Sequence, residues 1–283
     1  RMKGLAKEQL VMLKSLLSAL VLATFSVNSL AVELKGHLTQ GGLVTGKLSD
    51  VQSVSLNDTP LKLSKNGDFV FGFGRDAKTN HTLSWVDTNG KKHTQNLIIT
   101  KRDYNIDKIT GVAKKYVSPP KSVSERISRE AVAVRNARAV NSDLTYFLDP
   151  VLKPAQGRIS GVYGSQRYFN GEPRRAHFGL DIANKTGSPV YAPIGGTVVF
   201  AEPDLYYSGG TLILDHGHGI TSTYIHLSKL DVNVGDKVKQ GNKVAEIGAT
   251  GRVTGPHLDW RFNWKGERLD PGLLMQDTLA NKK

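Results

Sequence analysis

Apolar and polar residues alternate along much of the chain, in short segments that glycine and asparagine interrupt. Residues 32–101 hold several such segments, separated by turn sequences such as QGG, NDTP, KNGD and TNGK. Asn-Gly pairs favour tight hairpins, and a period of two is typical of strands with one buried face. These residues are therefore predicted to form a small β-sandwich, which we interpret as a binding or spacer domain.

The pattern changes between residues 102 and 153. In the segment KSVSERISREAVAVRNARAV, apolar residues recur at spacings of three and four, which is the period of a helix with one apolar stripe. Ser122 and Glu125 have the spacing of a capping box at the start of this helix. We expect a linker with a helix of about four or five turns, whose arginines lie on a solvated face; contact with an acidic polymer is the alternative.

Strand-like segments return over residues 154–275, again with glycines at their joints. Examples are PVYAPIGGTVVFAE, GGTLILDHG and GITSTYIHLS. Glycine interrupts each apolar run before a helix could gain three turns. The sequence predicts a mainly antiparallel sheet or barrel here, a C-terminal tail over residues 276–283, and a mainly β fold for the whole chain.

The first 31 residues have a different character. Lysines precede the apolar run LLSALVLATFSV, and small residues stand at Ser29 and Ala31. This order is typical of a secretory signal peptide cleaved after Ala31, and the run is shorter than the roughly 20 apolar residues of a membrane span. We expect export to the periplasm or cell envelope, with no integral membrane span after cleavage. Met12-Leu13-Lys14 stands just before the run, and Met12 is the alternative native start.

Composition narrows the chemistry and the partners. The 283 residues include no cysteine, so neither disulfides nor thiol catalysis are available. The net charge of +13 favours an anionic partner through long-range attraction. Nucleic acid is not expected, because dense Lys/Arg runs and base-stacking motifs are missing from the sequence. An anionic component of the cell envelope fits an exported basic chain better.

Histidines and carboxylates gather in the predicted C-terminal sheet. In HFGLDIA, His177 and Asp181 are four residues apart, so a strand would direct both to one face. His226 in TYIHLS has apolar neighbours, and in GPHLDWRFNW His257 and Asp259 share a polar face. A catalytic zinc site takes three nitrogen or oxygen ligands and leaves a fourth position for water. His177, Asp181 and one group from residues 257–259 would make such a set.

Residues 155–275 resemble the lysostaphin-like, or LytM-like, zinc endopeptidases of peptidoglycan. HFGLDIA, GSPVYAPIGGTVV, GGTLILDHGHGITSTYIHLS and VGDKVKQGNKVAEIGATGRVTGPHLDW carry this resemblance. It implies that His177 and Asp181 bind zinc and that His226 and His257 assist catalysis. The last motif of the family is His-x-His, whose second histidine completes the metal site. Asp259 stands in that place here.

The departure at Asp259 leaves two interpretations open. We expect Asp259 to supply the third zinc ligand, with a less acidic bound water because a second carboxylate reduces the charge of the ion. The function that the resemblance implies is then zinc-dependent cleavage of amide bonds in the peptide crosslinks or stems of bacterial peptidoglycan. The alternative site has lost tight metal binding or recruits His216 or His218 from DHGHG. The alternative function is a catalytically impaired wall-binding protein that regulates or activates another cell-wall hydrolase.

Further polar residues are candidates for substrate contact. Arg261 and Asn263 continue the polar face of GPHLDWRFNW, where they could hold a carboxylate or a peptide carbonyl. Arg261 could equally neutralise a nearby aspartate. The resemblance places Tyr206, Tyr207 and Arg252 in loops around the groove. The partners expected are peptidoglycan and an envelope protein.

Overall fold

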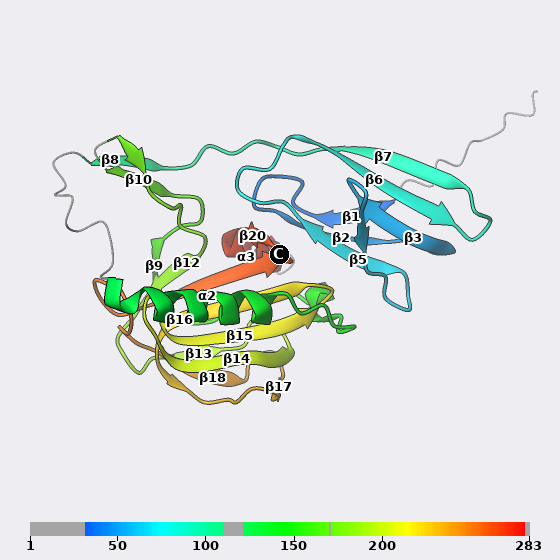
Figure 1. Cartoon of the computed structure of the whole chain (residues 1–283). Helices are drawn as coiled ribbons and strands as arrows, with labels where there is room; N and C mark the ends of the chain where they lie inside the picture. The colour runs from blue at the N-terminus through cyan, green and yellow to red at the C-terminus, as the bar shows by residue number, and fades with distance from the viewer. Residues whose placement is uncertain (1–31, 110–120, 170, 281–283) are drawn as a thin grey trace, which may run out of the picture. The chain divides into compact units, whose positions relative to one another are not determined.

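The chain is mainly β in the residues that the computed structural model describes, 32–109, 121–169 and 171–280 (Figure 1). The expected signal peptide over residues 1–31 lies outside them. Among these residues, none of the helices combines the length and the apolar character that a bilayer span requires. The mainly β prediction is confirmed, whereas the domain boundaries given above remain predictions.

Two antiparallel sheets form the N-terminal part, in the orders β1-β2-β5 and β4-β3-β6-β7. Gly67 and Gly90, from two of the Asn-Gly pairs, each have a φ of +82°. Gly90 lies in the predicted kind of hairpin, between β6 and β7, whereas the turn at Gly67 leads from β4 into β5 of the other sheet, so it is not a hairpin. Phe69 and Phe71 of β5 and Leu83 of β6 are fully buried and belong to the hydrophobic core. The strands are β1 Glu33–Gly36, β2 Leu43–Lys47, β3 Val51–Leu56, β4 Thr59–Leu61, β5 Asp68–Gly72, β6 Asn80–Asp87 and β7 Lys92–Ile98.

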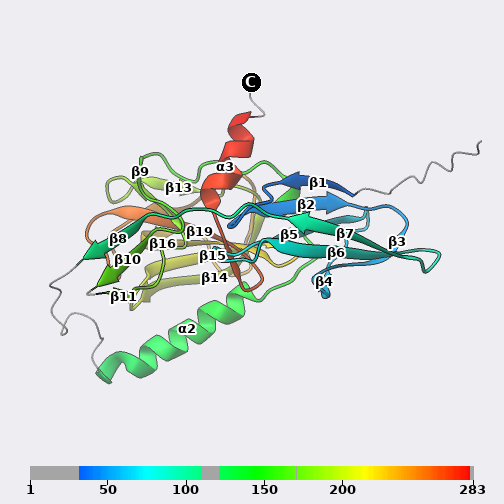
Figure 2. The same ribbon diagram turned by 90° about the horizontal axis from the view of Figure 1, so that it is seen from above.

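The linker helix is α2, Ser124–Arg138, which follows a short 3₁₀ turn, Lys121–Val123. Its N-cap is Val123, which makes no side-chain cap bond, so the predicted capping box is wrong: the helix begins one residue too late for Ser122 to cap it. None of its described side chains is fully buried. Figure 2 shows α2 running alongside β14, Gly196–Leu205.

The C-terminal part is built on a ten-stranded sheet with the order β17-β14-β15-β16-β19-β12-β9, and with β13, β18 and β20 pairing beside this path. A small sheet, β11-β10-β8, joins it to the linker. The helix α3, Pro271–Ala280, runs across the expected boundary at residue 275. The remaining strands are β8 Ile106–Ile109, β9 Arg158–Gly161, β10 Gln166–Phe169, β11 Glu172–Pro173, β12 Leu180–Ala183, β13 Pro189–Tyr191, β15 Gly209–Gly217, β16 Ile220–Leu230, β17 Lys237–Val238, β18 Lys243–Ile247, β19 His257–Trp264 and β20 Glu267–Leu269.

Strand β19 lies inside the large sheet, between β16 and β12. Its apolar row, Leu258, Trp260 and Phe262, is at most 1% exposed and packs in the core. Because side chains alternate along a strand, burial of this row directs Asp259, Arg261 and their neighbours to the opposite face. The core of the domain thereby fixes the direction of the polar row.

Candidate metal centre and groove

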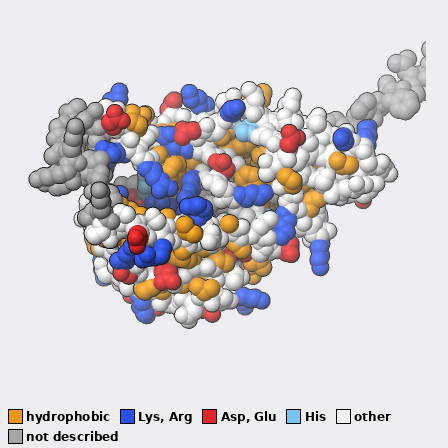
Figure 3. Space-filling view, in the orientation of Figure 1, with side chains coloured by type: hydrophobic (Ala, Val, Ile, Leu, Met, Phe, Trp, Pro, Cys, Tyr) orange, Lys and Arg blue, Asp and Glu red, His pale blue; other side chains and the backbone are white. Residues whose placement is uncertain are grey.

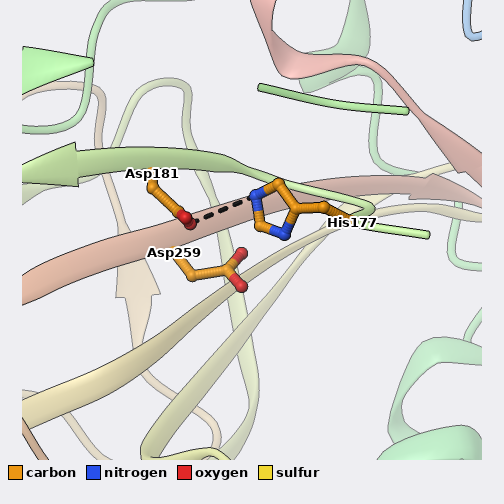
Figure 4. A group of neighbouring side chains, drawn as sticks. All are labelled: His177, Asp181 and Asp259. Atoms are coloured by element: carbon orange, nitrogen blue, oxygen red, sulfur yellow. Dashed lines mark ion pairs between the residues drawn. The ribbon is translucent and has the colours of Figure 1, made fainter. Parts of the chain in front are cut away.

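Two carboxylates stand side by side on β12 and β19. Asp181 and Asp259 are direct cross-strand partners. Like charges directly opposite each other destabilise a sheet unless a cation lies between them. His177 joins them, with one ligand atom from each of the three residues within 4.8 Å of the others (Figure 4). Among the described residues, only this group has the composition and spacing of a metal site.

His177 reaches this site from outside the sheet. It lies three residues before β12, so the prediction that one strand carries both His177 and Asp181 is wrong. Its backbone N–H donates to Ser165 O and its carbonyl accepts from Gly164 N, both at 2.8 Å. The loop at 164–165 therefore holds the histidine at the sheet edge.

The contact between His177 and Asp181 suits a cation. Nε2 of His177 lies 3.2 Å from Oδ1 of Asp181, yet both atoms are buried without a hydrogen-bond partner. Burial lowers the pKa of His177, but the carboxylates of Asp181 and Asp259 outweigh it and raise the pKa overall. A metal ion can replace the proton that these carboxylates favour, because metal ligands bind deprotonated. One imidazole nitrogen with carboxylate oxygens fits zinc.

Two glycines make room for the carboxylates. A Cβ at Gly179 would overlap Oδ1 of Asp259, and a Cβ at Gly161 would overlap Oδ2 of Asp181. Sequence reasoning missed both residues. The available signal was Gly179 itself, which lies between the two ligands in HFGLD and would otherwise have a side chain beside them.

Arg261 engages both oxygens of Asp259. Its Nε donates to Oδ1 at 2.8 Å and its Nη2 donates to Oδ2. Burial alone would raise the pKa of Asp259, but the charge and hydrogen bonds of Arg261 outweigh it and hold the pKa well below its usual range. The geometry thus corresponds to the second expectation for Arg261, neutralisation of an aspartate. Each carboxylate oxygen has a second lone pair, which stays available to a metal.

His226 and His257 are each bound to the backbone through Nδ1. Nδ1 of His226 lies 2.9 Å from Thr250 O, and Nδ1 of His257 lies 2.9 Å from Gly255 O. Carbonyls only accept, so each Nδ1 carries the hydrogen and each neutral ring keeps its lone pair on Nε2. Burial lowers the pKa of His226. The two ring centroids are 4.9 Å apart, and Nε2 of His257 is 3.9 Å from Oδ1 of Asp181.

The two other candidate histidines lie outside the group. Nδ1 of His216 hydrogen-bonds Gly195 O and its Nε2 hydrogen-bonds Ser222 Oγ, each at 2.7 Å. Burial lowers the pKa of His216 to about 4. His218 packs on Phe147 with ring centroids 4.8 Å apart. Both side chains are buried, and neither belongs to the metal group.

A cavity of about 1860 Å³ opens over His177, Asp181 and His226. Ile127, Ala131 and Val134 of α2 line its other wall, so the apolar stripe of the helix faces the groove. Figure 3 shows lysine and arginine side chains gathered beside a hollow on this face. The predicted substrate contacts that line the cavity are Tyr207, Arg252, Arg261 and Asn263.

Tyr206 is set back from the cavity lining. Its ring packs edge-on against Tyr207, with centroids 4.9 Å apart, and its N–H donates to Oε2 of Glu130 on α2 at 2.8 Å. The guanidinium carbon of Arg252 lies over the ring of Tyr207, 4.6 Å from its centroid. The loop that carries both tyrosines is thus held between α2 and Arg252.

Known proteins resemble this chain in sequence and in fold. The model of peptidase family M23 matches residues 175–271. An "uncharacterized metalloprotease" of Haemophilus influenzae is 34% identical over 190 residues, which are 64% of this chain and 38% of that protein. The peptidoglycan DD-endopeptidase ShyA of Vibrio cholerae is 38% identical over 114 residues, 40% of this chain and 26% of ShyA. A solved structure from Pseudomonas aeruginosa, described as a peptidase M23, has a TM-score of 0.65 at 25% identity and covers 84% of this chain and 94% of its own.

The chain spans only part of these curated relatives, 38% of the Haemophilus protein and 26% of ShyA. The matched residues nevertheless contain the whole group described above. They include the three candidate ligands and both histidines with free Nε2 atoms: His177, Asp181, His226, His257 and Asp259. Residues 175–271 of this chain therefore form a peptidase family M23 domain.

Proposed function

We propose that this chain is a zinc-dependent endopeptidase that cleaves amide bonds in the peptide crosslinks or stems of bacterial peptidoglycan. The observation that carries this proposal is the convergence of His177, Asp181 and Asp259 within 4.8 Å at a large cavity in an M23 domain. The name of ShyA, a peptidoglycan DD-endopeptidase, supports the choice of substrate.

His177, Asp181 and Asp259 would hold the zinc ion, and the remaining position would be open to water and substrate. When bound, zinc supplies a Lewis acid that polarises a peptide carbonyl and lowers the pKa of water. Arg261 cancels the charge of Asp259, so the three ligands with Arg261 carry the net charge of one carboxylate. We therefore revise the expectation of weakened acidity: the Asp259–Arg261 pair resembles a neutral imidazole in charge.

His226 and His257 are suited to handle protons. With Nδ1 bound to a carbonyl, each ring can accept a proton or, once protonated, donate a hydrogen bond through Nε2. Because the pKa of His226 is lowered by burial, it is neutral and able to act as a base at pH 7. We propose that the pair accepts the proton of the attacking water and hydrogen-bonds the oxyanion that develops on the substrate.

A second candidate function rests on the same contact of Asp259. Because both of its oxygens already accept from Arg261, a metal ion has to share them with a cation. If that competition prevents tight binding, the chain would bind peptidoglycan through the inherited groove and regulate another hydrolase of the envelope. In both cases we propose that the chain works after export, in the periplasm or cell envelope. Without residues 1–31 it has 34 Lys and Arg against 24 Asp and Glu, a net charge of +10 that favours the anionic wall.

Hydrolysis of purified peptidoglycan separates the two functions. The chain is incubated with peptidoglycan alone, with a chelator, and with chelator followed by zinc, and released muropeptides are identified by mass spectrometry. We expect amide cleavage that disappears with chelator and returns with zinc. His177→Ala should be inactive, and the control His93→Ala, far along the sequence in β7, should be active. Intact crosslinks with one zinc bound per chain would exclude the enzyme.

A further inference from the structure

Cations dominate the cavity beyond the metal group. Among the described residues that line it are eight arginines and one lysine, against three acidic residues, Asp107, Glu130 and Asp181. A cavity wall with one sign of charge attracts ligands of the opposite sign. The question is which of these cations are free to bind one.

Several arginines of this wall lack a carboxylate partner among the described residues, and three of them surround the same strand. In the part of the chain that the structure describes, Arg138, Arg175 and Arg268 have no acidic side chain within ion-pair distance, whereas Arg261 is paired with Asp259. Nε of Arg138 donates to Thr223 Oγ1 at 3.2 Å, and Nη1 of Arg268 donates to the amide of Asn263. These partners are uncharged, so they leave the charges of both arginines uncompensated.

The sheet register places Arg138 and Arg268 beside the same strand, β19. Thr223, which holds Arg138, is the cross-strand partner of Arg261, and Asn263 is the partner of Arg268. Burial and the repulsion of Arg268, Arg261 and Arg175 lower the pKa of Arg138 to about 8. Burial and the nearby arginines also lower the pKa of Arg268, to about 10. Half-buried cations that repel one another are stabilised by an anion between them.

Asn263 gives a second, independent indication of a ligand. It is 1% exposed and lines the cavity, and its Oδ1 accepts from Arg268 at 2.9 Å. Its Nδ2 is buried without a hydrogen-bond partner. Buried amide donors are rarely left unsatisfied, so this N–H group indicates an acceptor that binds in the cavity.

We propose that Arg138, Arg268 and Asn263 form a binding subsite for a carboxylate of the peptide substrate, with Arg175 beside it. Planar guanidinium groups pair with carboxylates through two parallel hydrogen bonds, and the Asn263 amide adds a neutral donor. The proposal rests on the proposed function, since it assigns a peptide to the groove. It also makes α2, through Arg138, a part of the substrate site.

The register gives the position of this carboxylate on the substrate. Arg261 and Asn263 lie two and four residues beyond Asp259 on β19, which corresponds to about 7 to 13 Å. An extended peptide spans at most roughly 3.3 to 3.6 Å per residue. The carboxylate therefore lies about two to four residues from the amide bond at the metal group.

Binding in the presence of chelator tests this subsite without requiring hydrolysis. A crosslinked muropeptide with free carboxylates and the same molecule with amidated carboxylates are titrated into the full chain by calorimetry. The variants are Arg138→Gln and Arg268→Gln. A third variant, Arg138→Lys, keeps the positive charge but loses the two parallel N–H donors of the guanidinium group. The matched control is Arg129→Gln, which removes one arginine from the same helix, where its nearest carboxylate is Glu125 at 3.9 Å.

We expect each glutamine variant to bind the free-acid muropeptide with an affinity about ten-fold or more below that of the wild type. Arg138→Lys should have an intermediate affinity, and Arg129→Gln should have the affinity of the wild type. The amidated molecule should bind the wild type as weakly as the acid binds Arg138→Gln. Thermal unfolding should show that Arg138→Gln is at least as stable as the wild type, because a repulsion is removed. Three results would overturn the subsite. The wild type would bind the acid and the amide equally tightly, Arg138→Gln and Arg129→Gln would weaken binding equally, or inorganic phosphate would bind as tightly as the peptide acid. Cleavage of both forms at one rate by the zinc-loaded chain would also overturn it, and would leave the proposed function intact.

Discussion

Removal of the Arg261 guanidinium should leave a buried, uncompensated carboxylate. The side chains of Asp259 and Arg261 are 4% and 20% exposed. Loss of one partner of a buried ion pair costs about 3 to 5 kcal/mol, because the other charge stays out of water. We therefore expect Arg261→Gln to lower the free energy of unfolding of the metal-free chain by about 3 kcal/mol or more at pH 7.

The pH dependence of this loss follows from the pKa of Asp259. In the wild type this pKa is lowered, so the pair stabilises the fold above the unfolded value of roughly 3.9, and this contribution is lost as the pH falls through the folded pKa. In Arg261→Gln, burial raises the pKa of the same carboxyl. The difference in the free energy of unfolding between the wild type and Arg261→Gln should therefore be largest at pH 7 and should decrease as the pH falls toward 4.

Urea unfolding followed by tryptophan fluorescence measures this difference, with chelator and with zinc. Zinc should stabilise Arg261→Gln more than the wild type, since the ion would supply the missing positive charge. The double variant Asp259→Asn with Arg261→Gln should recover part of the loss. Arg129→Gln should change stability by less than about 1 kcal/mol. A loss below about 1 kcal/mol for Arg261→Gln in chelator, or one that zinc leaves unchanged, would refute the reasoning.

Three other predictions concern neighbouring residues. Burial lowers the pKa of His216 in the folded chain to about 4, against 6.5 in the unfolded chain, so the unfolded state binds the proton first as the pH falls. The free energy of unfolding should therefore fall by up to about 3 kcal/mol from pH 7 to pH 4. Urea unfolding at several pH values should show a weaker pH dependence for His216→Gln. Gly179→Ala should weaken zinc binding about ten-fold or more in chelator competition, because its Cβ overlaps a ligand oxygen, whereas Gly255→Ala, with open space at its Cβ, should not. His226→Ala and His257→Ala should retain zinc but lose about 10² to 10⁴-fold in peptidoglycan cleavage; variants that cleave at the wild-type rate would show that neither ring handles the proton.

Local pattern was sufficient to predict the β-rich fold and the helix. Alternation with Asn-Gly turns indicates hairpins, and the period of the linker indicates α2, because both signals depend on neighbours in sequence. The first residue of α2 was predicted wrongly, because the preceding 3₁₀ turn shifts the N-cap from Ser122 to Val123. Boundaries of this kind depend on how the chain enters the helix, which no short motif records.

The candidate site likewise combines contacts between neighbours in sequence with contacts that only the fold creates. Asp259 and Arg261 lie two apart on one strand, so their pairing could be foreseen as one of two alternatives. Asn263 of the subsite was also foreseen as a substrate contact, because it lies on the same strand. Its two arginines could not be foreseen, because Arg138 comes from the helix and Arg268 from β20, and only the pairing of β16 and β20 with β19 brings them together. His177 likewise acts from a loop whose position depends on contacts with residues 164–165.

Zinc-edge X-ray absorption of the zinc-loaded chain tests most directly whether His177, Asp181 and Asp259 share one ion. We predict one zinc per chain, with a single imidazole among oxygen ligands at about 2.0 to 2.2 Å. Asp259→His should add a second imidazole to the spectrum, and His177→Ala should lose the bound ion. A wild-type chain that binds no zinc, or a spectrum that Asp259→His leaves unchanged, would contradict the assignment of Asp259 as a ligand.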